Sequence, residues 1–118
     1  MIDRRIRRGA IYWVNWHPSR GSEQSGRRPA LVVQANAGNR HPDYPNTIVA
    51  AVSTSVVKTP THVPVQPSEI NGLRAVSDIK CEQLMTISKD RLEEYIGQLE
   101  DELMKDVDEA IKRALSLS

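Results

Sequence analysis

The sequence holds a single cysteine, Cys81, and no grouping of cysteine and histidine at the spacing that binds zinc. A lone cysteine excludes a disulfide within the chain, and no metal site is expected. Because disulfides persist in oxidising compartments, their exclusion favours the reducing cytoplasm as the location. Cys81 has no histidine partner, which favours an inert core thiol over a nucleophile.

Long apolar runs are also missing. No segment approaches the ~20 consecutive apolar residues that span a bilayer, and no apolar stretch of the kind that directs export follows the basic segment 1–8. Internal repeats and low-complexity tracts are absent as well. With 118 residues, of which 39% are apolar, we expect one compact domain over residues 1–118 that does not associate with a membrane.

A strong excess of one charge is the third absence, because the formal net charge is only +1. Residues 1–88 nevertheless carry 11 basic and 6 acidic side chains, a net of +5, whereas residues 89–118 carry 5 basic and 9 acidic ones, a net of −4. An anionic partner should therefore meet the first part of the chain, and the modest excess fits a small nucleic-acid footprint. Ordinary solvated surface charge is an equally weighted alternative.

Short apolar stretches separated by turn residues predict several β-strands. Residues 10–16 are aromatic and β-branched, with Tyr12 and Trp16 on one face and Trp13 on the other, which predicts a strand covered on both faces. Further strands are predicted over residues 29–35, 47–53, 63–65, 75–80 and 83–87, with a turn at 69–72. The 63–65 strand contains Pro64, which confines it to an edge or a bulge.

Helical signals appear only toward the end of the chain. Ser88 is a candidate N-cap for a short helical turn that ends at Gly97, and a long helix is predicted from Glu100 onward, where apolar residues recur at helical spacing. Several short strands and a terminal helix indicate a mainly β fold. We expect a small, strongly bent antiparallel sheet or partly open barrel with a C-terminal helix.

The loop 21–26 followed by Arg28 and Pro29 is the strongest candidate for a site. Pro29 fixes its own φ and pushes Arg28 toward extended geometry at the start of an apolar strand, so the arginine is held by a rigid element. A guanidinium presents five donors in a planar fork that matches phosphate. An anion site and an ordinary surface ion pair are two interpretations of about equal weight.

Six segments, spread over most of the chain, together carry a resemblance to a known family. They are residues 8–13, 21–24, 28–33, 49–53, 60–63, and 81–83 with 86–87. In their order and spacing the chain resembles the MazF/PemK-type toxins of bacterial type II toxin-antitoxin systems. The resemblance implies an SH3-like barrel and a homodimer that cleaves single-stranded mRNA at specific short sequences without a metal or other cofactor, leaving a 2′,3′-cyclic phosphate and a 5′-hydroxyl.

The same resemblance assigns the catalytic positions. Arg28 matches the family's main catalytic arginine, and Ser53 stands where the family usually has threonine, with Thr54 beside it. Serine keeps the hydroxyl that can hold a phosphate oxygen, and Thr54 is expected on the opposite face if the strand continues. The interpretation without catalysis is a hydroxyl that caps the strand end.

Two further positions flank Cys81. In some relatives an arginine and an aspartate act there as acid and base, and this chain has Lys80 and Glu82. Glu82 can accept the 2′-hydroxyl proton or hold a base edge, and Lys80 provides a point charge in place of a fork. A catalytic histidine of the same relatives corresponds to Ser22, so that role is missing or reassigned.

The remaining candidates are assigned to substrate binding. Glu23 and Gln24 can pair with base edges or orient Arg28, with a local salt bridge equally weighted. His62 is a candidate for stacking on or hydrogen bonding to a base, and the amide of Gln83 suits base recognition and should lie near Ser53.

The resemblance also implies a cognate antitoxin, acidic and partly disordered, that competes with RNA for the positive surface; operator DNA is then reached only through the antitoxin. The aromatic residues of segment 10–16 would line its groove, although ordinary core and interface packing is slightly favoured for them. Two alternatives stay open: a non-cleaving RNA-binding adaptor, and a gyrase-poison-like binder on the same barrel. Loops 18–27 and 40–46 are expected to set the recognition sequence.

Overall fold

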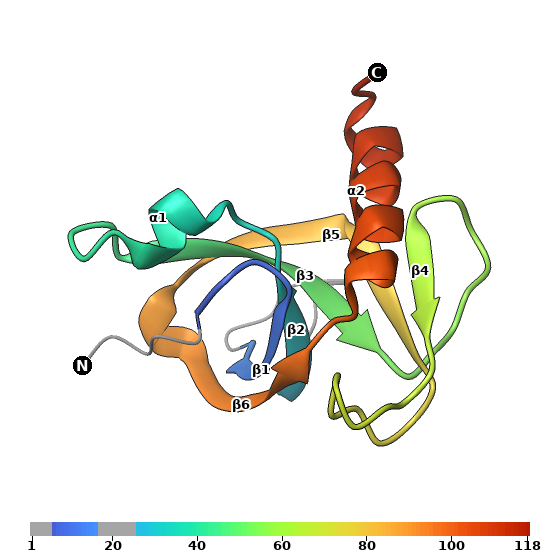
Figure 1. Ribbon diagram of the computed structural model, residues 1–118, viewed down its shortest axis with the longest axis horizontal. Coiled ribbons are helices and arrows are strands. Elements are labelled where there is room, and N and C mark those ends of the chain that lie inside the picture. The colour runs from blue at the N-terminus through green and yellow to red at the C-terminus, as the bar shows by residue number, and fades with distance from the viewer. Residues whose placement is uncertain (1–5, 17–25) are drawn as a thin grey trace.

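A six-stranded antiparallel sheet forms most of the computed structural model, which describes residues 6–16 and 26–118 (Figure 1). The elements, in chain order, are β1 (Ala10–Asn15), β2 (Arg27–Val32), α1 (Asn36–Arg40), β3 (Asn46–Ser53), β4 (His62–Val65), β5 (Ser77–Ser88), the 3₁₀ helix η1 (Lys89–Arg91), β6 (Leu92–Gln98) and α2 (Asp101–Leu115). The strand order is β4-β5-β3-β2-β1-β6, so the sheet is open with β4 and β6 at its edges. The mainly β fold with a C-terminal helix is confirmed.

The edge position of β4 follows from its sequence. Pro64 cannot donate to a ladder, and β4 pairs with β5 alone, as predicted for this segment. The second strand begins and ends earlier than expected, over Arg27–Val32, which brings Arg28 inside the strand.

The two strand pieces predicted over 75–80 and 83–87 form one continuous strand, β5. Its pairing with β3 shifts between two successive residues of β3, from Ala50 opposite Leu84 to Ala51 opposite Lys80. Residues 81–83 therefore have no partner in the β3 ladder and form a bulge. A bulge re-aims side chains at this point, and here it lies in the segment that the sequence linked to substrate contacts.

The prediction of a helical turn from Ser88 to Gly97 is correct only for its first residues. Ser88 does cap a helix, its hydroxyl accepting from the Asp90 N–H, but this 3₁₀ helix has only three residues and the chain then enters β6. Pairing with β1 overrides the local signal. Gly97 allows the backbone at Asn71 to approach β6 closely, because a Cβ at position 97 would lie 2.4 Å from the carbonyl oxygen of Asn71. The short helix α1, where only a break was expected, was also missed.

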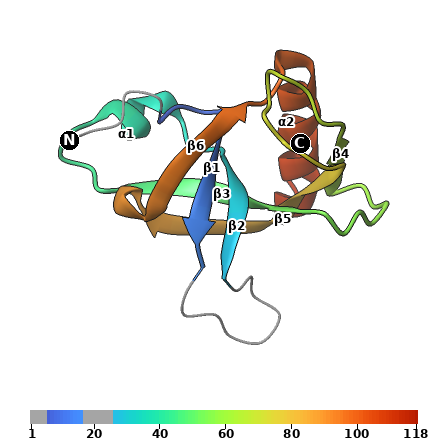
Figure 2. The same ribbon diagram turned by 90° about the horizontal axis from the view of Figure 1, so that it is seen from below.

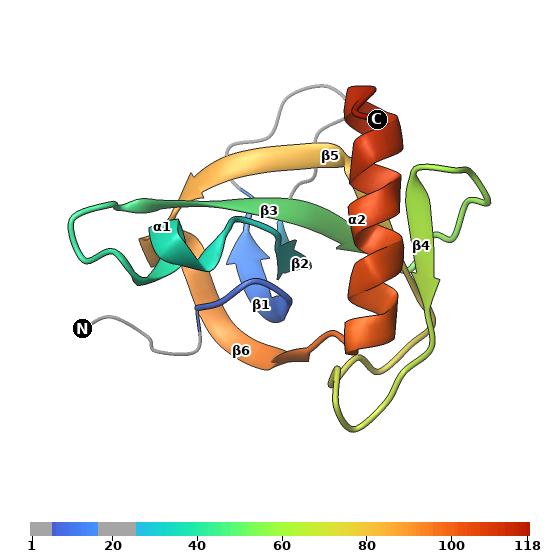
Figure 3. The ribbon, with the colours of Figure 1, turned by 45° about the horizontal axis from the view of Figure 1, so that its top comes forward.

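Apolar side chains cover both faces of the sheet. On one face, α2 packs against β4 and β5 through Val107 and Ala110, beside Ile79 and Val52 (Figure 3). The other face carries a second cluster that includes Tyr12 and is fully buried between strands. Figure 2 shows β1 and β2 side by side between the outer strands. The prediction that the first strand is covered on both faces is confirmed.

No helix in the described ranges is long and apolar enough to cross a membrane.

Candidate functional site

A row of polar side chains crosses three neighbouring strands at one end of the sheet. Ser53 on β3 lies directly opposite Asp78 on β5. On the other side of β3, Ala51 lies opposite Ala30, and continuing this register by two residues places Arg28 opposite Ser53. Cross-strand partners share a face, and the neighbours Val52 and Ile79 point into the core beneath α2. Arg28, Ser53 and Asp78 therefore occupy the face turned away from α2.

Arg28 also lines a cavity of about 580 Å³. Its polar and aromatic wall residues are three arginines, two aromatic residues, two hydroxyls and one carboxylate: Arg27, Arg28, Arg74, Trp13, Tyr95, Thr54, Ser77 and Glu94. The Arg27 guanidinium lies 4.6 Å from the centre of the Trp13 ring and pairs with Glu93 at 3.0 Å. Arg28 and Arg74 are both exposed. The cavity thus combines cationic forks with aromatic surface, the two groups that bind the phosphates and bases of a nucleic acid.

The two hydroxyls at the end of β3 have different surroundings. Ser53 Oγ accepts a hydrogen bond from the Ser55 N–H at 3.0 Å, a local cap of the kind weighed above, and it keeps its own proton to donate. The strand ends at Ser53, so the alternation that would turn Thr54 away no longer applies. Thr54 lies in the cavity wall with Arg28, and Ser53 is not among the described residues of that wall.

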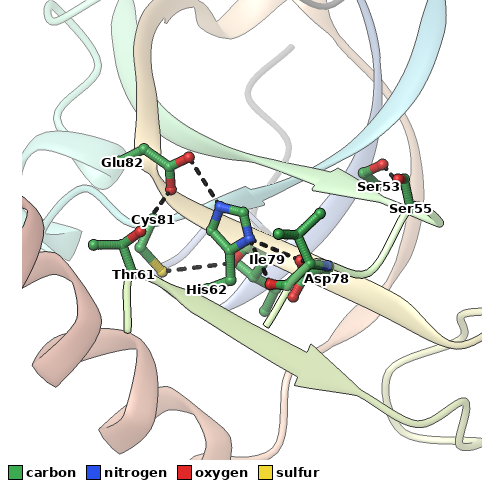
Figure 4. A network of polar contacts seen from close by, with 9 residues as sticks. Ser53, Ser55, Thr61, His62, Asp78, Ile79, Cys81 and Glu82 are labelled. Carbon is green, nitrogen blue, oxygen red and sulfur yellow. Dashed lines mark hydrogen bonds and ion pairs between the residues drawn. The ribbon is translucent and has the colours of Figure 1, made fainter. Parts of the chain in front are cut away.

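Glu82 and His62 belong to a network on the β5 bulge (Figure 4). The His62 Nε2 atom lies 2.9 Å from Glu82 Oε2, and the Thr61 hydroxyl donates to Glu82 Oε1 at 3.1 Å. The other ring nitrogen, Nδ1, lies 2.8 Å from Asp78 Oδ2. Only 8% of the His62 side chain is exposed, so its ring is not presented as a stacking platform.

These contacts shift two titrations. Burial alone would lower the pKa of His62, but the hydrogen bond to Glu82 and the charges of Glu82 and Asp78 outweigh it and raise the pKa above 6.5. Burial would likewise raise the pKa of Glu82, and the hydrogen bonds from His62, its own backbone amide and Thr61 lower it below 4.5. Glu82 is thereby stabilised as a carboxylate.

The other residues around the bulge are placed as follows. Lys80 is the cross-strand neighbour of His62 in the β4–β5 ladder, and it is half-buried. The expectation that Gln83 lies beside Ser53 is wrong, because Asp78 holds that position in the register and Gln83 lies in the bulge. Cys81 is fully buried, and burial, followed by the charges of Glu82 and Asp78, raises its pKa to about 12. An inert thiol is what the sequence predicted.

Ser22, Glu23 and Gln24 lie outside the described residues, so their roles stay predictions. Over the described part of the chain, no three histidine, cysteine or acidic side chains form a group that could hold a metal ion.

Sequence reasoning missed Asp78 and Arg74, and it gave Tyr95 no role. A carboxylate between the apolar partners of a buried strand was a usable signal for Asp78. Arg74 and Tyr95 had none, because only the folded chain brings their segments to Arg28.

Comparison with known proteins gives one consistent answer. The family model described as PemK-like, MazF-like toxin of type II toxin-antitoxin system matches residues 7–115. Endoribonuclease EndoA of Bacillus subtilis (strain 168) is 42% identical over 114 residues, which cover 95% of this chain and 96% of that protein.

Two solved structures share the fold. A mycobacterial endoribonuclease in complex with its cognate antitoxin has a TM-score of 0.79 at 27% identity, covering 95% of this chain and 96% of its own. The Mycobacterium tuberculosis toxin MazF-mt6 has a TM-score of 0.77 at 28% identity, covering 92% and 98%.

Proposed function

Because this chain belongs to the PemK-like, MazF-like toxin family of type II toxin-antitoxin systems, we propose that it is an endoribonuclease toxin that cleaves single-stranded mRNA at specific short sequences. The reaction needs no metal and leaves a 2′,3′-cyclic phosphate and a 5′-hydroxyl. The observation that carries the proposal is that Arg28 and Thr54 line one cavity wall, at the end of β3 where Ser53 also lies.

The chemistry of this cleavage sets three requirements. The ribose 2′-hydroxyl loses a proton, the pentacovalent phosphorane needs its negative charge stabilised, and the leaving 5′-oxygen gains a proton. Arg28 meets the second requirement, since its guanidinium can donate to two phosphate oxygens at once. The hydroxyl of Ser53 or Thr54 adds a donor to the same phosphate from the adjoining strand.

The cavity provides the binding surface. Arg74 contacts backbone phosphate beside Arg28, and the aromatic surface of Trp13 and Tyr95 packs against bases. An acidic antitoxin segment competes for these same groups, because a carboxylate and a phosphate both accept bidentate hydrogen bonds from a guanidinium. We extend the proposal to a homodimer acting in the cytoplasm, with operator DNA reached only through the antitoxin.

The deciding experiment is cleavage of a mixed-sequence RNA by the purified chain with EDTA present. Removing the Arg28 guanidinium as Arg28→Ala should lower kcat by about a hundredfold or more, the cost of losing one donor to a developing oxyanion. Arg7→Ala is the matched control, since Arg7 is an exposed arginine ahead of β1 that bonds Gln98 and is not among the described residues of the cavity wall. Circular dichroism checks that both variants keep the fold.

Each result has a distinct meaning. RNA that is shifted in a gel and stays intact supports the non-cleaving adaptor and overturns the proposal. Cleavage that survives Arg28→Ala overturns the assignment of Arg28. In the same assay Arg74→Ala should raise KM more than it lowers kcat, and 5′-end sequencing of the products gives the recognition sequence.

A further inference from the structure

The network around His62 has a definite proton count. Nδ1 lies 2.8 Å from Asp78 Oδ2 and 3.1 Å from the Val57 carbonyl oxygen, and Nε2 lies 2.9 Å from Glu82 Oε2. All three neighbours are acceptors. A neutral imidazole carries one N–H, so one of its nitrogens would direct a lone pair at a carboxylate oxygen. Both contacts to ionised carboxylates are hydrogen bonds only when both nitrogens are protonated, so the geometry favours His62 as an imidazolium.

The charges around His62 agree with this protonation state. Of the neighbouring elements, β5 carries Asp78, Lys80 and Glu82, and segment 54–61 carries Lys58. Helix α2, which packs against β4 and β5, carries eight further charged residues: Asp101, Glu102, Lys105, Asp106, Asp108, Glu109, Lys112 and Arg113. The carboxylates of Asp78 and Glu82 are the ones in contact with the ring. Arg113 instead donates to the Pro60 carbonyl oxygen at 3.1 Å.

Asp78 is fixed more firmly than a surface carboxylate. It is fully buried, and its Oδ2 accepts from the Val57 N–H at 2.9 Å as well as from His62. Within residues 6–16 and 26–118, its buried Oδ1 has no hydrogen-bond partner. An isolated buried carboxylate is costly, so the charge of His62 is what makes this burial possible. Asp78 and His62 together hold the N–H and the C=O of the same residue, Val57.

Val57 lies in segment 54–61, which begins directly after Ser53 and includes Thr54. Asp78 is also the cross-strand partner of Ser53. The Asp78 backbone therefore pairs with the strand end, and its carboxylate holds the segment that follows. Both oxygens of Glu82 are engaged by Thr61 and His62, which leaves Glu82 a poor proton acceptor and gives it the task of holding the ring.

We propose that Asp78, acting through charged His62, is a positioning residue of the cleavage site: its carboxylate fixes segment 54–61, which follows Ser53 and presents Thr54 to the scissile phosphate. This inference rests on the proposed endoribonuclease function. Loss of the His62 proton turns one of its two carboxylate contacts into a repulsion, so the hold on segment 54–61 weakens as the pH rises.

The test is Asp78→Asn, which keeps the shape and one oxygen but removes the charge. We expect kcat on a cleavable RNA oligonucleotide to fall about tenfold with a smaller change in KM, the size of effect that misplaced reacting groups produce. The wild type should lose activity as the pH rises through the pKa of His62. In the variant this loss of activity should occur at lower pH, and the NMR titration of the His62 ring should move to lower pH in parallel.

Thr47→Val is the matched control. Thr47 is also fully buried and hydrogen bonded, at the other end of β3, so its loss tests destabilisation alone. It should lower Tm without moving the His62 titration or the pH break. His62→Gln is a second variant in case Asp78→Asn fails to fold. It should have a lower kcat, and its activity should no longer fall as the pH rises through the pKa of His62.

The outcomes separate the two proposals. A wild-type chain that cuts no RNA under any condition overturns the function itself. A wild-type chain that cuts RNA, matched in kcat and pH profile by folded Asp78→Asn or by His62→Gln, overturns only the positioning role. A His62 titration that stays in place in Asp78→Asn also overturns that role.

Discussion

Two connections flank strand β3, and different chemistry holds each of them. Residues 33–45 lead into β3 and are fixed around buried Asn39, whose amide donates to the Gln34 carbonyl oxygen at 2.9 Å and accepts from Thr47 Oγ1 at 2.8 Å. Residues 54–61 lead out of β3 and are fixed by the contacts of His62 with Asp78 and Glu82. The Asn39 amide thus lies at the centre of one connection, where Lys89 Nζ also donates to the carbonyl oxygens of Gly38 and His41. A histidine between two carboxylates lies at the centre of the connection that carries the proposed site.

The difference has a physical consequence. Amide hydrogen bonds do not depend on pH in this way, whereas a network centred on His62 depends on a proton whose pKa is raised above the ordinary value of 6.5. Conditions can therefore loosen the segment after Ser53 while the segment before β3 stays in place.

The largest expected loss of stability comes from the connection that leads into β3. Asn39→Ala removes all side-chain hydrogen bonds of a residue that is 1% exposed and leaves Thr47 and Gln34 without it, so it should destabilise the chain by about 3 kcal/mol. Urea unfolding at pH 6 and pH 9 measures this loss. It should be equal at the two values, and a strong pH dependence would contradict the neutral character of the Asn39 hydrogen bonds.

A smaller, pH-dependent effect is expected for His62→Gln. The pKa of His62 is raised in the folded state, so its stabilisation is fully present below its ordinary value of 6.5 and is lost as the pH rises through the folded pKa. We expect a loss of about 2 kcal/mol near pH 6 because two charge-assisted hydrogen bonds are removed. By pH 9 the difference from the wild type should have shrunk. The same urea titrations give this value, and a constant difference would show that His62 is not charged.

The smallest effect is expected for Glu82→Gln. The pKa of Glu82 is lowered in the folded state, so its stabilisation is present above 4.5 and is lost as the pH falls through the folded pKa. Because 40% of its side chain is exposed and screened by solvent, we expect less than about 1 kcal/mol. Thermal unfolding between pH 3 and pH 7 locates this acid-side change. In the cleavage assay this variant should keep the acid limb of the kcat profile, whereas loss of a general base would remove it.

Local pattern was sufficient for much of the fold. Aromatic and β-branched residues identified β1, and a short apolar stretch identified β3. Pro64 placed its strand at an edge, and the apolar repeat after Glu100 gave α2. The pattern failed where pairing decided the outcome. The segment after Ser88 has a true helix cap, yet pairing with β1 turns it into β6.

The site divides in the same way. Arg28 was singled out by the strand start at Pro29 beside it, and Ser53 was assigned by the resemblance to the family. Gln83 was misplaced because the bulge at residues 81–83 shifts the register, and a sequence does not reveal which residue of a strand bulges.

The sequence by itself determined the family, the arginine at the start of β2, the hydroxyls at the end of β3 and the inert character of Cys81. These properties depend on residue type and on neighbours a few positions away. Only the tertiary structure decided that Asp78 faces Ser53 and that His62 lies between two carboxylates, because those contacts join residues 16 to 25 positions apart through the register of β3, β4 and β5. The protonation of a histidine between two carboxylates depends on the distances between their atoms, and the order of residues along the chain does not give those distances.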